Sequence, residues 1–125
     1  MANSVGLHEP IEELSSDTID RHRAIASIQE ELEAVDWYDQ RADATSDETL
    51  AAVLAHNRDE EKEHAAMTLE WLRRRDPPLD AHLRTYLFTS QPITEIEKEA
   101  EAGVEGSELV TEGCLNIGGL KGDAL

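Results

Sequence analysis

The sequence predicts an all-α fold, in which two long helices form an antiparallel hairpin and a short C-terminal helix follows. Three observations predict it. Two long stretches contain no Gly or Pro: the first runs from about Asp17 to Ala44, and the second ends at Asp76-Pro77-Pro78. Each stretch contains a stripe of mostly apolar residues that recur in alternating steps of four and three, and this spacing places them on one face of a helix. Because few residues separate the stretches, the two helices should pack antiparallel.

Composition favours a small domain that assembles with copies of itself. The chain has 125 residues, of which 39% are apolar but only 4% aromatic, so a monomer would have few large side chains to bury. The net charge of -17 argues against nucleic acid and anionic membrane surfaces as partners. The same charge suits cation binding, although a solvated acidic surface explains it equally well.

Cysteine content and hydropathy restrict the possible cross-links, metal sites and cellular location of the protein. Cys114 is the only cysteine, which excludes an intrachain disulfide and a thiolate metal site within one chain. The N-terminus lacks the apolar run of a signal peptide, and no apolar stretch is long enough to cross a bilayer. The expected location is therefore the cytoplasm.

The first long helix carries a carboxylate on its apolar face. Residues 1–14 should form a flexible N-terminal segment with a short turn at Ile11 to Leu14, and Ser15, Ser16 or Asp17 should cap the helix. Its main stripe is Ala24, Ile28, Glu31, Val35, Tyr38 and Ala42. A carboxylate within such a stripe needs an ionic partner, a proton or a metal ion. A salt bridge to another helix is thus one interpretation of Glu31, and metal binding is the other.

The second long helix carries polar residues in the middle of its stripe. Ser46 or Asp47 should cap it, and it should end near Arg75. The stripe is Leu50, Leu54, Asn57, Glu61, His64, Thr68 and Trp71. Glu31 and Glu61 lie at nearly equal distances from the turn, so an antiparallel hairpin should bring them to the same height. This match favours metal binding over a salt bridge.

The C-terminal third divides into three parts. Leu79 to Phe88 should form a short third helix, which Pro92 ends, so the helical domain spans residues 15–92. Residues 93–112 are interpreted as a linker, with a brief helix around residues 95–102 as the alternative. Residues 113–125 place Leu115, Ile117 and Leu120 among small residues. They form either a tail without a partner or a docking peptide with apolar anchors.

The pair Glu61-x-x-His64 is typical of a dinuclear metal site. Residues three apart lie on one helix face, and carboxylate–imidazole pairs of this spacing hold two irons or manganese ions in helical bundles. With Glu31 the chain supplies half of such a site. A two-fold dimer would complete both a four-helix bundle and a di-iron centre, with Glu61 of each copy bridging the metals. Calcium at the same or neighbouring carboxylates is an alternative, and zinc fits the donors less well.

Two aromatic residues follow Glu31 along the helix. Tyr38 shares the stripe of Glu31, where it would hydrogen-bond a ligand or pass an electron, and Trp37 precedes it. The alternative is that both rings only pack at an interface between helices.

Two segments resemble the encapsulated ferritins in sequence, order and separation. They are residues Glu30 to Tyr38 and His56 to Ala65, and the Tyr86-Leu87-Phe88 region agrees as well. The resemblance extends over roughly Glu12 to Pro92. It implies a ferritin-like subunit, a ring-shaped decamer built from five dimers, and a ferroxidase centre at a dimer interface.

The resemblance also implies roles for individual residues. Glu31, Glu61 and His64 would bind iron, with Trp37 and Tyr38 around them, and Glu30 and Glu33 would form a metal entry site. The family oxidises Fe(II) to Fe(III) with O2 and stores the iron inside an encapsulin nanocompartment. Residues 113–125 are similar to its cargo-loading peptides, with Cys114 and Gly119 where Ser is expected. The remaining alternatives are a helical oligomer that binds iron or calcium without catalysis, and a purely structural one.

Overall fold

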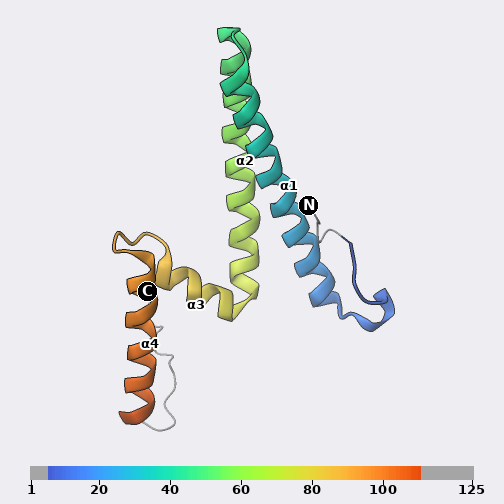
Figure 1. Cartoon of the computed structure of the whole chain (residues 1–125). Helices are drawn as coiled ribbons and strands as arrows, with labels where there is room; N and C mark the ends of the chain where they lie inside the picture. The colour runs from blue at the N-terminus through green and yellow to red at the C-terminus, as the bar shows by residue number, and fades with distance from the viewer. Residues whose placement is uncertain (1–5, 111–125) are drawn as a thin grey trace. The chain divides into compact units, whose positions relative to one another are not determined.

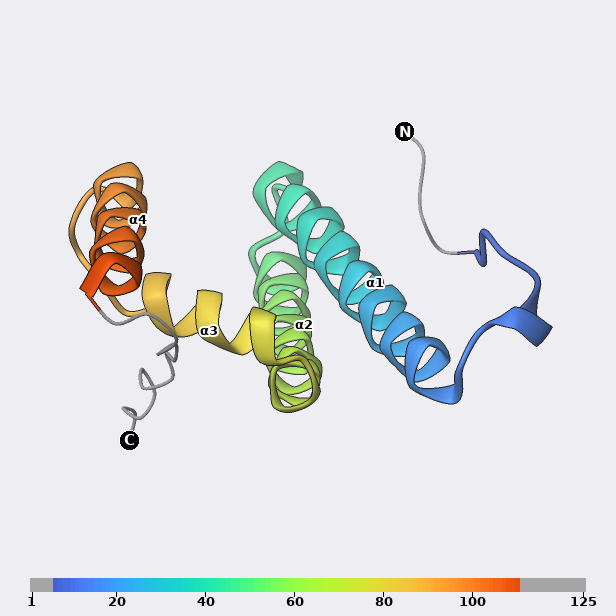
Figure 2. The same cartoon turned by 90° about the horizontal axis from the view of Figure 1, so that it is seen from below.

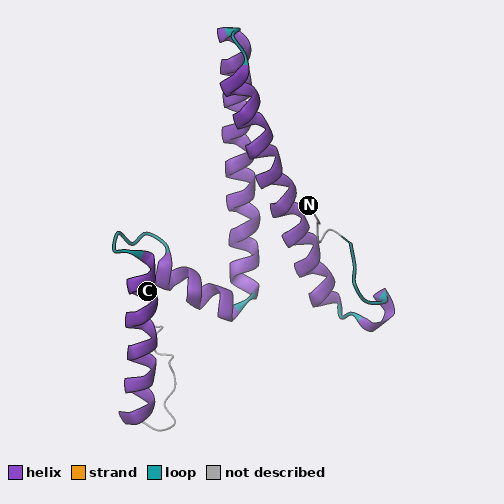
Figure 3. Cartoon of the chain, viewed as in Figure 1, coloured by secondary structure: helices purple, strands orange, loops and turns teal. Residues whose placement is uncertain are grey.

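The computed structural model describes residues 6–110, with side chains described up to residue 103. All regular secondary structure in these residues is helical (Figure 3). The elements are η1 (Ile11–Glu13), α1 (Ser16–Ala44), α2 (Glu48–Arg75), α3 (Pro77–Tyr86) and α4 (Ile93–Val110). The all-α prediction is confirmed. The 3-10 turn η1 coincides with the turn expected near Ile11.

Side chains cap the two long helices at the positions that their sequences favour. Ser15 Oγ accepts a hydrogen bond of 3.1 Å from the backbone N–H of Thr18. Asp47 Oδ1 accepts one of 3.0 Å from the backbone N–H of Leu50. These caps satisfy N–H groups that the first helical turn leaves unpaired. At the other end, Asp76 and Pro77 follow the last residue of α2, since Pro cannot continue the backbone hydrogen bonds of the preceding helix.

The helices α1 and α2 form the predicted antiparallel hairpin. Residues 45–47 connect them. The two helices lie side by side near this connection and separate toward the N-terminal end of α1 (Figure 1, and from below in Figure 2). The buried apolar side chains of the hairpin are Ala24, Ala65 and Leu72. Because two of the three are alanines, the hairpin has a small core of its own.

Several large apolar side chains of the hairpin remain on its surface. They come from both helices and comprise Ile25, Leu32, Trp37, Leu50, Val53 and Met67. Leu32, which directly follows Glu31, is 54% exposed, and Met67 is 63% exposed. The hairpin therefore presents apolar surface that burial in a larger assembly would remove from water.

The remaining helices form a second unit that begins at Pro78. The helix α3 starts with Pro77 and Pro78, which the first turn of a helix tolerates because its N–H groups have no partner in the helix. It ends at Tyr86, two residues before the predicted end. Phe88 follows in a left-handed conformation, with φ of 62°, and its side chain is fully exposed.

The linker interpretation of residues 93–112 is wrong for residues 93–110, which form α4. This helix also extends well beyond the brief alternative around residues 95–102. Its sequence contains Glu, Ala and Lys, which favour helix, and the cost of a helical Gly is only about 1 kcal/mol. Ile96 is buried within this unit. The predicted docking residues Leu115, Ile117 and Leu120, and the boundary of the 113–125 segment, lie outside the described residues.

Candidate metal centre

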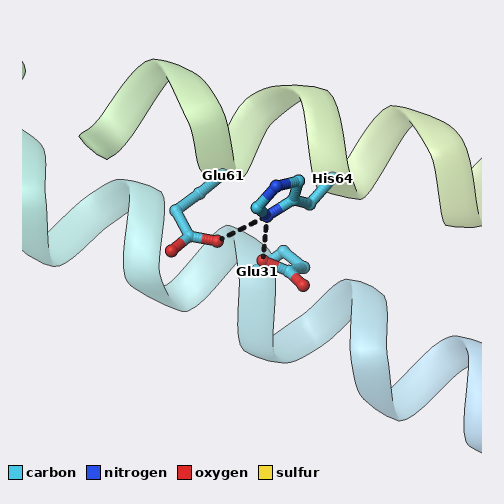
Figure 4. A group of neighbouring side chains, drawn as sticks. All are labelled: Glu31, Glu61 and His64. Atoms are coloured by element: carbon cyan, nitrogen blue, oxygen red, sulfur yellow. Dashed lines mark hydrogen bonds and ion pairs between the residues drawn. The ribbon is translucent and has the colours of Figure 1, made fainter. Parts of the chain in front are cut away.

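Three side chains converge across the hairpin. Glu31 projects from α1, and Glu61 and His64 project from α2 toward it (Figure 4). His64 Nδ1 lies 3.3 Å from Glu61 Oε1 and 3.6 Å from Glu31 Oε1. One donor atom from each residue falls within 4.8 Å of the other two. Local helix geometry brings Glu61 and His64 together, since residues three apart share a face, and the antiparallel register adds Glu31.

The cluster is accessible from solvent. The side chains of Glu31 and Glu61 are 28% and 24% exposed, and that of His64 is 48% exposed. The cluster thus lies at the edge of the α1–α2 interface rather than inside a closed core. A hydrated ion can reach it directly from solvent.

The Glu31 and Glu61 carboxyl groups shift each other's pKa in opposite directions. A hydrogen bond that Glu31 donates to Glu61 raises the pKa of Glu31, and partial burial and the negative charge of Glu61 act in the same direction. The same hydrogen bond, with Glu31 as donor, lowers the pKa of Glu61, and His64 lowers it further. Two neighbouring carboxylates behave in this way because ionising both places like charges side by side.

His64 is the only cationic partner of these carboxylates among the described residues. Its hydrogen bond to Glu61 raises the pKa of the imidazole, and the charges of Glu31, Glu61 and Glu60 add to the effect. Neither Glu31 nor Glu61 forms an ion pair with Lys or Arg in residues 6–110. Within the described residues of one chain, Glu31 therefore does not form the Arg or Lys salt bridge considered as an alternative. A divalent cation would supply the positive charge that the site lacks.

The donor set fits a transition metal of intermediate hardness. Two carboxylates and one imidazole suit Fe(II) and Mn(II), whereas Ca(II) prefers oxygen donors alone. Three side chains do not fill the coordination sphere of either metal. The cluster thus offers one side of a site and leaves the other side open.

Other residues predicted at the site lie outside this cluster. Glu30 and Glu33 are exposed on α1 and are not part of the metal-binding group. Trp37 is exposed and Tyr38 is half-buried, and both rings contact Arg41. The Arg41 guanidinium carbon lies 5.9 Å from the centre of the Trp37 ring and 5.6 Å from that of Tyr38.

Two arginines form contacts along the hairpin that were not predicted from the sequence. Arg41 follows Trp37 and Tyr38 by one helical turn, a spacing that could have indicated the contact. Arg58 forms an ion pair of 2.9 Å with Asp39 across the hairpin. That pair can be predicted only when the register of α1 against α2 is known, because no local sequence pattern indicates it.

Comparison with known proteins agrees with the fold. The model of the EncFtn-like family matches residues 6–90. An encapsulated ferritin-like protein from Rhodospirillum rubrum is 59% identical, over 98% of this chain and 92% of its own length. An encapsulin nanocompartment cargo protein from Myxococcus xanthus, EncC, is 34% identical over 76% of this chain and 79% of its own length.

A solved structure extends the comparison to three dimensions. A Nitrosomonas europaea protein, known from its crystal structure, is 64% identical to this chain and aligns with a TM-score of 0.69. The alignment covers 70% of this chain and 97% of the other. The family match spans most of the sequence and contains Glu31, Glu61 and His64. On this evidence the chain belongs to the EncFtn-like family.

Proposed function

We propose that this protein is a ferroxidase, which oxidises Fe(II) to Fe(III) with O2 at a di-iron centre shared by two copies of the chain. The observation that carries the proposal is the convergence of Glu31, Glu61 and His64 without an Arg or Lys partner in the described residues. Iron is the substrate, and O2 takes one electron from each Fe(II). The chain contributes an anionic site that binds Fe(II) and favours the higher charge of Fe(III).

The open side of the cluster supports a centre shared between copies. A second chain related by a two-fold axis would bring the same three ligands to that side, since a two-fold interface joins identical surfaces. It would also cover exposed apolar residues beside the ligands, such as Leu32 and Met67. Two hairpins together would form a four-helix bundle of the kind that holds dinuclear carboxylate sites. Larger rings of such dimers, including a decamer, are part of the proposal.

Exposed carboxylates give cations a path to the site. Glu30 and Glu33 flank Glu31 on α1 and face solvent. They would attract Fe(II) and form the entry site of the proposed centre. Trp37 and Tyr38, held under Arg41, would lie near this path.

The relatives support an encapsulin nanocompartment as the setting. One is called an encapsulated ferritin-like protein and another an encapsulin nanocompartment cargo protein. We propose that this chain is likewise cargo, that it serves iron storage and detoxification in the shell, and that residues 113–125 dock to the shell protein. Co-expression with the shell tests this. Deleting residues 115–125 should abolish loading, and full loading of the truncated chain would contradict the docking role.

Aerobic Fe(II) oxidation by separated oligomer and monomer fractions tests the proposed activity. Activity should be confined to the oligomer, because the monomer holds half of the ligands. Glu61→Gln and His64→Ala should each lower the rate at least about tenfold. Glu63→Gln removes the same charge on the exposed face of α2 and should keep the rate within about twofold. Full activity in Glu61→Gln would overturn the ligand assignment, and activity in the monomer would overturn the shared centre.

A non-catalytic site for iron or calcium is the second candidate function. The partial exposure of Glu31 and Glu61 and their oxygen donors favour it. An oxygen electrode separates the two functions, because a binding protein would take up Fe(II) without consuming O2.

A further inference from the structure

Arg58 links the two helices of the hairpin close to the candidate metal centre. Its Nη1 atom lies 2.9 Å from Asp39 Oδ1 on α1, and its Nε atom lies 3.0 Å from Asp59 Oδ1 on α2. The Arg58 side chain is only 24% exposed. Lys62 also pairs with Asp59, at 3.4 Å, but this pair stays within α2. Arg58 therefore joins α1 to α2, and Lys62 does not.

The position of this ion pair relates it to the metal ligands. Asp39 follows Glu31 by about two helical turns, and Arg58 precedes Glu61 by about one. In an antiparallel hairpin both lie between the metal ligands and the connection at residues 45–47. The two helices separate toward the N-terminal end of α1, as Figure 1 shows. The Arg58–Asp39 pair thus joins α1 to α2 on the side of the ligands that faces the connection.

Packing alone fixes the register of the hairpin weakly. The buried apolar side chains are Ala24, Ala65 and Leu72, so few large groups interlock across the interface. The middle of the interface is polar, and the negative charge of Glu61 is among the causes that raise the pKa of Glu31. A slip by one helical turn moves a side chain by about 5.4 Å. Such a slip would separate His64 from Glu31, which now lie 3.6 Å apart.

We propose that Arg58 is a positioning residue for the metal centre, because its ion pair with Asp39 holds Glu31 of α1 opposite Glu61 and His64 of α2. The inference rests on the metal site of the proposed function but not on its redox activity. Arg58 acts through the helices and does not contact the metal.

Charge and position predict opposite effects for loss of Arg58. Removing a cation makes the surroundings of the site more negative, so electrostatics alone would tighten the binding of a divalent ion. Loss of the contact between the helices would instead move Glu31 away from Glu61 and His64 and weaken binding. The sign of the change in affinity therefore separates the two effects.

Titration of the assembled, full-length protein with Co(II) tests the inference. Co(II) accepts the same donors, and its visible absorption reports the geometry of its ligands. Arg58→Met and Asp39→Asn should each weaken Co(II) binding about tenfold and alter the spectrum at saturation. The double variant should bind as the single variants do, since both changes break one contact. Arg58→Lys should restore part of the affinity, because it can still reach Asp39.

Lys62→Met is the matched control. It removes the same charge from α2 without breaking a contact between the helices, so it should leave Co(II) affinity within about twofold or slightly higher. Far-UV circular dichroism and oligomer size establish that each variant folds and assembles. Should Arg58→Met fail to fold, Arg58→Gln removes the same charge and the same ion pair, so the sign of the affinity change remains the readout.

The inference and the proposed function fail in different ways. Unchanged or tighter Co(II) binding by Arg58→Met would overturn the role of Arg58, whatever the effect of Asp39→Asn. Absence of Co(II) binding by wild type, or full binding by Glu61→Gln, would instead overturn the metal site itself.

Discussion

His64 Nδ1 lies 3.6 Å from Glu31 Oε1, so an imidazole of α2 meets a carboxylate of α1 across the hairpin (Figure 4). The same nitrogen contacts Glu61 at 3.3 Å. With a proton on the ring, this nitrogen donates to a carboxylate, and without it the lone pair is free to bind a metal. Protons and cations therefore compete for one atom.

This competition predicts that cation affinity rises with pH. The pKa of His64 is raised, chiefly by its hydrogen bond to Glu61, so the ring remains protonated above the usual range of histidine. Binding must displace this proton, and the raised pKa of Glu31 adds competition from protons at that carboxylate. Mn(II) affinity measured from pH 5.5 to 8 should increase throughout and level off above the raised pKa of His64. A flat profile would show that His64 is not a ligand.

NMR titration of the histidine rings checks the cause of that shift. Glu61→Gln should lower the pKa of His64 because it removes the largest contribution, and Glu60→Gln should lower it less. In the metal-free protein, the contact of protonated His64 with Glu61 contributes stability below the ordinary histidine pKa. That contribution is lost as pH rises through the raised value. Equal shifts in the two variants would contradict the assignment.

Leu72→Ala should destabilise the hairpin most among its apolar truncations. Leu72 is 6% exposed and is the large apolar side chain among the buried residues of the hairpin, so its loss leaves a cavity. The expected cost is about 2–5 kcal/mol in the free energy of unfolding, measured with urea on the monomer fraction. Met67→Ala, at a 63% exposed position, should cost well under about 1 kcal/mol in the same fraction. Equal costs would mean that the core lies elsewhere.

Leu32→Ser should act on association rather than on folding of the hairpin. Leu32 is 54% exposed beside Glu31, on the surface that the proposed second copy covers. Analytical ultracentrifugation should show weaker self-association, with the unfolding of the monomer nearly unchanged. Ile11→Ser, an exposed residue of η1 outside the hairpin, is the control. Assembly of Leu32→Ser at wild-type concentrations would exclude this surface as the contact.

Glu70→Gln should destabilise the protein at neutral pH but not near pH 2. Arg73 and Arg74 hydrogen-bond the Glu70 carboxylate and lower its pKa to about 2. Since the folded-state pKa lies below the unfolded one, the contact stabilises above the ordinary glutamate pKa and is lost as pH falls toward 2. The difference in Tm between Glu70→Gln and wild type should shrink over that range.

Glu63→Gln is the control for this pH dependence. Glu63 forms no ion pair with Arg or Lys among the described residues, so the Tm difference from wild type should vary less with pH. A similar trend for both variants would assign the effect to net charge rather than to the Arg pairs.

The sequence predicted the parts of the fold that local rules determine. Helix periodicity and caps such as Asp47 predicted the hairpin and the ends of its helices. The equal distances of Glu31 and Glu61 from the turn predicted that the metal-binding residues meet. The full length of α4 was not predicted, and only a brief helix around residues 95–102 was considered, because charged residues with two glycines are typical of linkers. The Arg58–Asp39 pair joins residues from two helices, so it appears only once both helices are packed.

The backbone of Phe88 has a practical consequence for protein engineering. A left-handed φ of 62° costs a residue with a β-carbon about 1 kcal/mol, and Gly would avoid that cost. The ring recovers little of it by burial, since it lies in solvent. Redesign guided by thermostability alone would therefore replace this residue early and discard an exposed aromatic ring. Mutant libraries that are meant to preserve the exposed surface of the native chain should therefore leave Phe88 unchanged.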